Sequence, residues 1–261
     1  MLRGLYTSAS GMLADQRRLD VVANNLANAN TAGFKRETTV SKPFSQFLIE
    51  RVNDRDPLTK AGTTQVGLLG IGTYVGTTAA RLTNGALTPT GNTLDVAIAG
   101  DGFFAVETPV GVRYTRQGSF LVNAEGTLVT PEGYPVLVDG SPVTGSSEGM
   151  SITPTGEVQD GGPTLGRLTV VTSQELGAMR KEGNGLWAQS GAGEPASLVT
   201  PANGAGTYTL RVGYLEASNV EAVTEMVDMI NTMRSYEANQ KALQAQDQTL
   251  QQAVTEVGRV G

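Results

Sequence analysis

The sequence predicts an α+β protein with long N- and C-terminal heptad helices that form a coiled-coil layer, and a central, mostly antiparallel β domain. Three observations lead to this prediction. Apolar residues recur at alternating steps of three and four at both ends of the chain. The middle consists of short apolar–polar alternations separated by turn dipeptides such as Glu125–Gly126 and Asp139–Gly140. Glycine is abundant, with 33 residues, and suits many tight turns.

Residues 1–35 are predicted to form the N-terminal helix of the assembly layer. Gly33, which follows two asparagines, is the expected end of this helix because Asn and Gly tolerate the left-handed backbone. The apolar stripe of the helix repeats every seven residues. Its heptad positions are Leu5, Met12, Leu19 and Leu26.

Residues 36–90 are expected to form an extended connector with some strand content, because their second half is rich in Gly and Thr and lacks helical periodicity. Residues 91–214 are predicted to form the central β domain. The run LDVAIAGDGFFAVET at 94–108 indicates two short strands around a glycine turn. Further strands are expected at 150–172 and 206–214.

Residues 215–261 are predicted to form the C-terminal helix of the same assembly layer. Ser218 or Asn219 is the expected N-cap, and Glu221 stands three positions after the serine, as in a capping box. Steps of three and four recur along this helix, with two polar interruptions. The apolar members of the stripe are Met226, Met229, Met233, Tyr236, Leu243, Leu250, Val254 and Val257.

The two terminal segments carry opposite charge. Residues 1–36 hold five basic and two acidic side chains, a net charge of +3, whereas residues 216–259 hold seven acidic and three basic ones, a net charge of −4. Opposite signs favour the association of two helices and help to fix its register. Two long stripes at opposite ends of a β-rich chain therefore favour helices that pair with each other or with neighbouring subunits.

Composition excludes several classes of protein. The chain has neither cysteine nor histidine, which removes disulfides, thiolate metal sites, the commonest general base and most zinc sites. We therefore expect no catalytic residue, no metal, no cofactor and no small-molecule substrate. A net charge of −6 argues against nucleic acid as a partner. The N-terminus lacks the apolar run of a secretory signal, and no stretch of about 18 apolar residues predicts a membrane span.

Motifs that could indicate a ligand-binding or catalytic site are better explained as turns and core-packing residues. Gly70, Gly72 and Gly76 have a spacing near that of a dinucleotide-binding loop, but no helical run of useful length follows them. Acidic residues such as Asp139 lie in Asp–Gly turns, where the carboxylate bonds to its own backbone. Trp187, the single tryptophan, is predicted to be a local core anchor.

Three blocks of the sequence, in the right order, match a known pattern. They are VVANNLANANTAGFKR at 21–36, the pair GDGFFAV and YTRQGSFLVNAEGTLVTPEGYPVL at 100–106 and 114–137, and GYLEASNVEAVTEMVDMINTMRSYEANQKALQAQDQTL at 213–250. These blocks resemble the two ends and the middle β domain of bacterial flagellar axial proteins. The motif residues at the two ends are Asn24, Asn25, Asn28, Asn30, Gly33, Phe34, Ser218, Asn219 and Val220.

The resemblance implies a subunit of the flagellar basal-body rod, with the distal (FlgG-type) rod as the first hypothesis and the proximal (FlgF-type) rod or another hook–basal body subunit as the alternative. It implies export through the flagellar type III apparatus without a cleaved signal peptide. It also implies polymerisation into a helical tube, the drive shaft for motility, with the helices as an inner coiled-coil layer. The partners implied are copies of the chain, other rod and hook axial proteins, the export apparatus and surrounding bushing rings.

Two readings from other classes stay open at this point. A secreted coiled-coil adapter or adhesin would form a closed oligomer instead of a filament. A secreted enzyme that cuts peptidoglycan or another carbohydrate would need a pair of carboxylates in a cleft.

Overall fold

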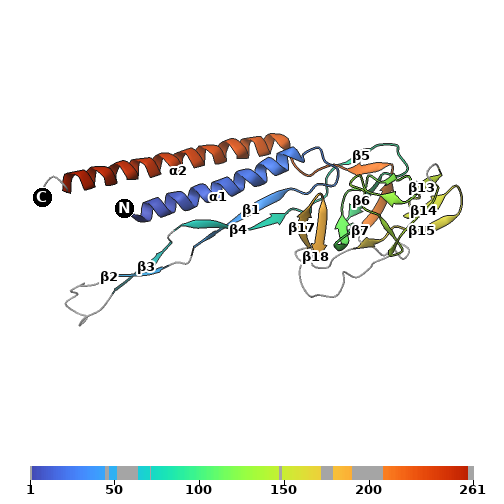
Figure 1. The fold of residues 1–261 in the computed structure, drawn as a ribbon, viewed down its shortest axis with the longest axis horizontal. Helices are drawn as coiled ribbons and strands as arrows, with labels where there is room; N and C mark the ends of the chain where they lie inside the picture. Colours follow the sequence, from blue (N-terminus) through green and yellow to red (C-terminus); the bar gives the residue numbers. More distant parts are fainter. Residues whose placement is uncertain are drawn as a thin grey trace. The chain divides into compact units, whose positions relative to one another are not determined.

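The computed structural model describes residues 2–44, 47–51, 64–70, 72–146, 149–171, 179–189 and 208–257. The chain divides into two compact units, and each draws on segments that are far apart in the sequence (Figure 1). The first unit comprises Met1–Leu26, Glu37–Ala79 and Glu221–Gly261, and the second comprises Ala27–Arg36 and Ala80–Val220. One helix at each end and mostly antiparallel strands between them confirm the α+β fold class. The division into four sequence segments stays a prediction.

The first unit is built on two helices, α1 (Leu2–Ala27) and α2 (Ala222–Val257), which lie side by side (Figure 1). Gly11 of α1 faces the side chain of Asn239, and Asn25 hydrogen-bonds to the side chain of Glu225. Residue numbers rise along one helix as they fall along the other, so the pair is antiparallel. Apolar periodicity located both helices correctly because each keeps one face packed.

The end of α1 differs from the prediction. The helix stops at Ala27 and does not continue to Gly33. The chain turns at this point because the amide of Thr31 donates to the carbonyl of Asn28 at 3.1 Å. Gly33 does adopt a left-handed backbone, with φ of +70°, but in the loop beyond the helix.

The start of α2 also differs from the prediction. The helix begins at Ala222, so neither Ser218 nor Asn219 is its N-cap. Glu221 directly precedes the helix, and its carboxylate accepts a hydrogen bond from the Thr224 hydroxyl at 2.9 Å. An acidic side chain at a helix N-terminus is favoured by the helix dipole. The expected capping box was therefore placed too early in the chain.

Among the described residues, four strands complete the first unit. β1 (Glu37–Pro43) pairs with β4 (Thr73–Ala80), and β2 (Phe47–Arg51) pairs antiparallel with β3 (Thr64–Leu69). Thr and Val are frequent in β1 and β4, and both residue types favour strands. The stretch expected to be an extended connector thus contains two short strand pairs.

The largest sheet of the second unit has five strands in the order β16, β7, β8, β18 and β17, and all neighbours are antiparallel. In the same order, their bounds are Val170–Val171, Phe103–Thr108, Gly111–Thr115, Leu186–Gln189 and Met179–Gly183. The three-stranded sheet has the order β13, β14 and β15, with bounds Met150–Ile152, Glu157–Asp160 and Thr164–Arg167.

The remaining strands of the second unit form antiparallel pairs. β6 (Val96–Gly100) pairs with β19 (Tyr208–Val212), and β5 (Leu87–Pro89) pairs with β20 (Tyr214–Glu216). Two further pairs are β9 with β10 and β11 with β12, with bounds Leu121–Val122, Leu128–Val129, Leu137–Val138 and Ser141–Pro142. The predicted strands at 94–108 are confirmed as β6 and β7.

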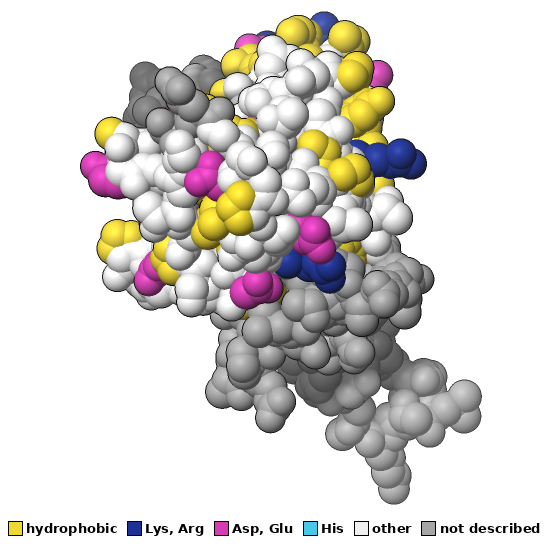
Figure 2. All heavy atoms as spheres, turned by 90° about the vertical axis from the view of Figure 1, so that its right-hand side faces the viewer, with side chains coloured by type: hydrophobic (Ala, Val, Ile, Leu, Met, Phe, Trp, Pro, Cys, Tyr) yellow, Lys and Arg dark blue, Asp and Glu magenta, His cyan; other side chains and the backbone are white. Residues whose placement is uncertain are grey.

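The core of the second unit gathers side chains from nearly all of these strands. Phe104 and Phe120 are fully buried and meet edge to face, with ring centroids 5.1 Å apart. Trp187 is also buried and packs on Phe103, so its prediction as a core anchor is confirmed. On the face drawn in Figure 2, hydrophobic side chains lie among acidic, basic and neutral polar ones. Such a mixture is normal for a solvated surface.

Neither α1 nor α2, over the residues described, is long and apolar enough to cross a membrane.

Candidate assembly site

The contact between α1 and α2 repeats every seven residues on both helices. A Cβ atom at Gly4 would lie 2.4 Å from the Gln246 amide nitrogen, and one at Gly11 would lie 3.0 Å from that of Asn239. The absence of a side chain at these two glycines therefore lets two amide side chains of α2 approach the α1 backbone. Heptad spacing on both helices is the pattern expected of a helical seam.

Polar contacts also run along this seam. The carboxylate of Asp15 accepts hydrogen bonds from Ser235 Oγ at 2.9 Å and from Asn239 Nδ2 at 3.0 Å. Near the opposite end, Asn25 Nδ2 donates to Glu225 Oε2 at 3.1 Å. Polar residues at fixed seam positions specify register, because any shift leaves them without these partners.

The predicted stripe residues fall into two groups in the structure. The members of the first group are half-buried, and they are Leu5, Met12, Leu19, Leu26, Met229, Tyr236, Leu243 and Leu250. Alternate members of the α2 stripe are exposed, and they are Met226, Met233 and Val254. The side chain of Val257 lies outside the described residues.

Exposed apolar side chains also gather on the first third of α2. Val223, Val227 and Ile230 are between 50% and 70% exposed, and Met226 and Met233 are each 49% exposed. Residues three, four and seven apart share one face of a helix. We call these five residues the α2 apolar face.

Asn25 joins α1 to the first strand of the same unit. Its Nδ2 donates to the Glu37 carbonyl at 2.8 Å, and its Oδ1 accepts from the Glu37 amide at 2.9 Å. The side-chain amide thus occupies the place of a paired strand residue. Since Asn25 is only 1% exposed, these bonds are shielded from water.

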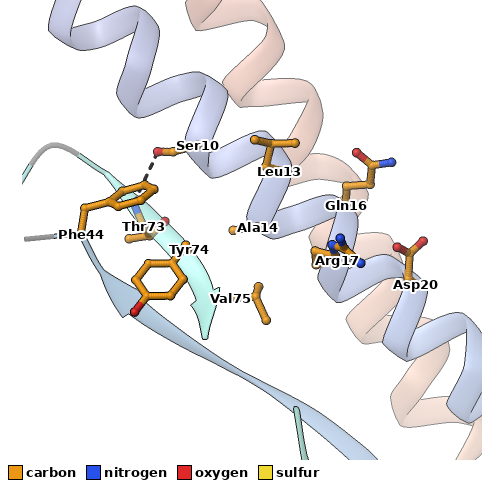
Figure 3. Close-up of a pocket in the computed structure, with 10 residues that line it drawn as sticks. All are labelled: Ser10, Leu13, Ala14, Gln16, Arg17, Asp20, Phe44, Thr73, Tyr74 and Val75. Carbon is orange, nitrogen blue, oxygen red and sulfur yellow. Dashed lines mark hydrogen bonds between the residues drawn. The ribbon is translucent and has the colours of Figure 1, made fainter. Parts of the chain in front are cut away.

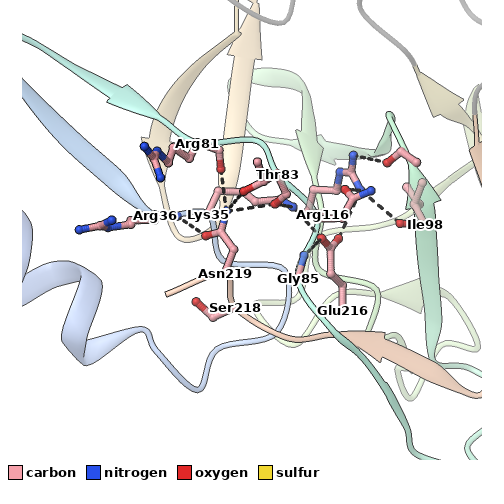
Figure 4. Close-up of polar contacts among 12 residues, drawn as sticks. Lys35, Arg36, Arg81, Thr83, Gly85, Ile98, Arg116, Glu216, Ser218 and Asn219 are labelled. Atoms are coloured by element: carbon pink, nitrogen blue, oxygen red, sulfur yellow. Dashed lines mark hydrogen bonds and ion pairs between the residues drawn. The ribbon is translucent and has the colours of Figure 1, made fainter. Parts of the chain in front are cut away.

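A buried ion cluster lies in the second unit, where the segment after α1 meets the segment before α2 (Figure 4). Lys35 Nζ lies 2.6 Å from Glu216 Oε1, and Arg116 Nη1 lies 3.3 Å from Glu216 Oε2. All three side chains are at most 2% exposed. We call Lys35, Arg116 and Glu216 the ion cluster.

Backbone groups make further hydrogen bonds to the ion cluster. Lys35 Nζ donates to the Thr83 carbonyl at 2.9 Å, and Arg116 Nη2 donates to the Gly100 carbonyl at 2.7 Å. Glu216 Oε1 also accepts from the Gly85 amide at 2.9 Å. Burial lowers the pKa of the Lys35 ammonium and that of the Arg116 guanidinium, while the Glu216 carboxylate acts in the opposite direction.

The motif residue Asn219 adds neutral hydrogen bonds beside the ion cluster (Figure 4). Its Oδ1 accepts from the Arg36 amide at 2.7 Å, and its Nδ2 donates to the carbonyls of Arg81 and Thr83 at 2.8 and 3.0 Å. One side chain therefore ties three separate stretches of the second unit together. This role explains why Asn219 does not cap α2.

Gly33 and Phe34 bring the other end of the chain to the same place. The Gly33 amide donates to the Glu216 carbonyl at 2.7 Å, and a Cβ at Gly33 would lie 2.5 Å from the Arg116 carbonyl carbon. Phe34 is buried, and Lys181 Nζ lies 3.7 Å from the centre of its ring. Only glycine fits a left-handed position so close to another backbone.

The other motif residues make local contacts. Asn28 Oδ1 accepts from the Thr31 hydroxyl at 3.2 Å, and Ser218 Oγ accepts from the Val220 amide at 3.3 Å. Asn24 and Asn30 are exposed. The structure thus brings Gly33, Phe34 and Asn219 together, and it places Asn25 in the first unit.

Sequence reasoning missed the ion cluster and Glu225. In the sequence analysis, Lys35, Glu216 and Glu225 served only to calculate the net charge of the two terminal segments. A signal was nevertheless present, because Lys35, Arg116 and Glu216 each lie inside one of the three blocks that resemble axial proteins. Charged residues within such blocks are candidates for a buried network.

Three family models match the chain. Residues 5–35 match the flagella basal body rod protein model, residues 97–160 match the D1 domain of the flagellar hook protein FlgE/F/G, and residues 211–256 match the C-terminal model of flagellar basal body rod FlgEFG proteins. They cover both ends and the middle of the chain.

Full-length relatives agree with these matches. The chain is 35% identical to the flagellar basal-body rod protein FlgG of Bacillus subtilis, over 97% of this chain and 98% of the relative. It is 34% identical to the rod protein FlgF of Caulobacter vibrioides and 32% identical to the flagellar hook-basal body complex protein FlhO of Bacillus subtilis, over 100% of both chains in each case.

Paired terminal helices and a separate β unit, matched in order by these three models, define a flagellar axial protein. More narrowly, the chain belongs to the flagellar basal-body rod protein family. It is a structural subunit of the rod and a component of the flagellar basal body.

Proposed function

We propose that the chain polymerises through its terminal helices, which form the inner coiled-coil layer of a helical tube, while the β unit forms the outer layer. The heptad contacts between α1 and α2 and the exposed α2 apolar face support this proposal. The apolar face carries it, because five large apolar side chains on one solvent-exposed helix face are typical of a surface that a partner covers. The role is structural and involves no catalysis.

The proposed division of the chain follows from this role. Residues 1–35 and 215–261 form the assembly layer, 36–90 connects it, and 91–214 is the outer β domain. The proposed assembly contacts use the stripe residues of both helices. Two different surfaces that meet head to tail generate an open helical polymer where the rotation between copies does not close into a ring, whereas a self-complementary surface closes into a dimer.

Export and partners complete the proposal. The chain leaves the cytoplasm through the flagellar type III apparatus without a cleaved signal peptide, and it meets other rod and hook subunits and the surrounding rings. Its place is the distal rod, with the proximal rod as the alternative. Relatives named FlgG and FlgF have nearly the same identity to this chain, 35% and 34%, so a direct experiment must decide between them.

Electron microscopy of basal bodies from a strain that lacks this gene tests the proposal. A distal subunit predicts basal bodies that keep the inner part of the rod and lack its outer part and the hook. A proximal subunit predicts a rod that ends nearer the cytoplasm. A plasmid copy of the gene should restore the full structure, and complete rods in the deletion strain would contradict the proposal.

A further inference from the structure

A groove lies in the first unit, on the side of α1 where β1 and β4 run (Figure 3). It has a volume of about 540 Å³. Its walls include Leu13 and Arg17 from α1, and Phe44 and Tyr74 from the strand side. Leu13, Phe44 and Tyr74 are 65%, 45% and 43% exposed. We call this feature the aromatic groove.

A ring contact and two hydrogen bonds hold the residues of the aromatic groove in place. The rings of Phe44 and Tyr74 lie 5.3 Å apart, and the Phe44 amide donates to the Gly72 carbonyl at 3.0 Å. The amide of Thr73 donates to the Ser10 hydroxyl at 3.4 Å, which joins the strand side to α1 (Figure 3). An exposed pair of aromatic rings beside an exposed leucine is a preferred surface for apolar side chains of a partner.

The same chain cannot fill this groove with its own α2 apolar face. α2 already contacts α1 through the seam that includes Gly4, Gly11 and Asp15. The groove uses Leu13 and Arg17, which belong to a different side of α1. A helix that fills the aromatic groove must therefore come from another copy.

The order of charges favours the α2 apolar face as the occupant. Along α1, the groove is lined by Leu13, then Arg17 four residues later, then Asp20 three residues after that. Along α2, an apolar residue is followed by an acid and a base at steps of four, as Met233, Glu237 and Lys241. These steps correspond to about 4.5–6 Å at 1.5 Å per residue.

A parallel arrangement of the two helices therefore brings opposite charges together. It places Met233 beside Leu13, Glu237 beside Arg17 and Lys241 beside Asp20. All four charged side chains are exposed in the single chain. With Met233 kept beside Leu13, an antiparallel helix would instead set Arg17 against Met229, so charge complementarity in this register favours the parallel arrangement.

We infer that the aromatic groove of one subunit binds the α2 apolar face of a second copy, with the bound helix parallel to α1. This inference rests on the proposed function and names the contact that propagates the polymer. The groove and the apolar face are different surfaces, so each subunit offers one of each, which is the type of contact that an open helical polymer needs. Each contact buries Ile230 and Met233 against Phe44 and Tyr74.

Cysteine cross-linking tests this contact cleanly, because the natural chain contains no cysteine. Chains that carry Tyr74→Cys are mixed with chains that carry Ile230→Cys, polymerised and oxidised. We expect a cross-linked heterodimer at a yield at least ten times that of the control mixture with Val254→Cys. Val254 is 72% exposed on the same helix but lies outside the α2 apolar face.

Charge reversal provides a second measurement that does not depend on disulfide geometry. We expect Arg17→Glu to reduce filament formation at least ten-fold and Arg17→Glu with Glu237→Arg to restore it. Circular dichroism checks that both variants keep their helices. Filaments that form without the Tyr74–Ile230 cross-link, or a double variant that fails to recover, would overturn the inference and leave the proposed function standing. A wild-type chain that forms no filament would overturn both.

Discussion

Lys35, Arg116 and Glu216 lie where water hardly reaches, and their geometry decides what each substitution does. Two cations share one carboxylate, and each also donates a hydrogen bond to a backbone carbonyl. Burying a charge is costly unless it is paired and hydrogen-bonded. The ion cluster therefore makes the second unit sensitive to the loss of any one member.

Glu216→Gln is expected to destabilise the second unit by about 3–5 kcal/mol, because it leaves two cations buried without a counter-charge. Urea unfolding followed by the fluorescence of Trp187 measures this loss. Glu157→Gln is the matched control, since Glu157 pairs with Arg167 at 3.3 Å with both side chains about one-third exposed. That change should cost less than about 1 kcal/mol. Equal losses of unfolding free energy in the two variants would show that the buried ion cluster stabilises the chain no more than an exposed ion pair does.

Lys35 also predicts a dependence on pH. Burial lowers the pKa of Lys35 in the folded chain below 10.5, the usual value that it has in the unfolded chain. Between the folded-state pKa and 10.5, the unfolded chain therefore binds more protons than the folded chain. Stability should therefore rise with pH across that window, through this group. The difference in unfolding free energy between the natural chain and Lys35→Met isolates the effect, because all other titrations are shared. A difference that falls or stays constant up to pH 10.5 would refute it.

Gly33 gives a test of close backbone approach. Gly33→Ala combines a left-handed φ of +70° with a Cβ only 2.5 Å from the Arg116 backbone, and we expect it to cost more than about 3 kcal/mol. Gly133→Ala is the control, because Gly133 has φ of +87° and no atom within 4 Å of the added carbon. It should cost only about 1–2 kcal/mol. Urea unfolding compares the two, and similar losses would contradict the steric explanation.

In the first unit, polar side chains join helices and strands by hydrogen-bonding to backbone groups of another element. Asn25 pairs with both backbone groups of Glu37 and also with the Glu225 side chain, so it holds β1 and α2 to the end of α1. The seam between the helices is otherwise mixed, with glycines opposite amide side chains and with half-buried Leu, Met and Tyr. Such a seam specifies register more than it adds stability.

Asn25→Ala is expected to weaken this junction by about 2 kcal/mol, because it removes the shielded hydrogen bonds from Asn25 to both backbone groups of Glu37. Hydrogen exchange should show faster exchange at the Glu37 amide, and thermal melting should show an earlier loss of helix. Asn30→Ala is the control, since Asn30 is exposed, and it should change stability by less than about 0.5 kcal/mol. An unchanged Glu37 amide in Asn25→Ala would contradict the assigned role.

The elements themselves were mostly predictable, for physical reasons that also explain the errors. Periodicity located α1, α2, β6 and β7, because one face of each element is packed. The start of α2 was wrong because Asn219 bonds to the Arg81 carbonyl within the second unit instead of capping α2, and no local pattern predicts a distant partner. Within the α2 stripe, Met226 and Met233 are exposed, and the role of the stripe as an assembly interface stays a prediction. The ion cluster joins positions 35, 116 and 216, so only the folded chain brings it together.

At the scale of the whole molecule, the chain has a unit that holds both termini and a β unit with its own core. The three family matches follow the same order along the chain. We therefore expect assembly and folding to respond to different residues. Changes on the α2 apolar face should stop the rod from growing, and changes on the surface of the β unit should not.

Electron microscopy of basal bodies that carry Val223→Asp and Ile230→Asp together tests whether the α2 apolar face assembles the rod. Both residues are at least half exposed, so the folded chain should tolerate the change, while a charged α2 apolar face should not assemble. Val110→Asp in the β unit is the control, because Val110 is 78% exposed. We predict truncated rods and loss of motility for the double variant and complete rods for the control. Complete rods built from the double variant would contradict the account.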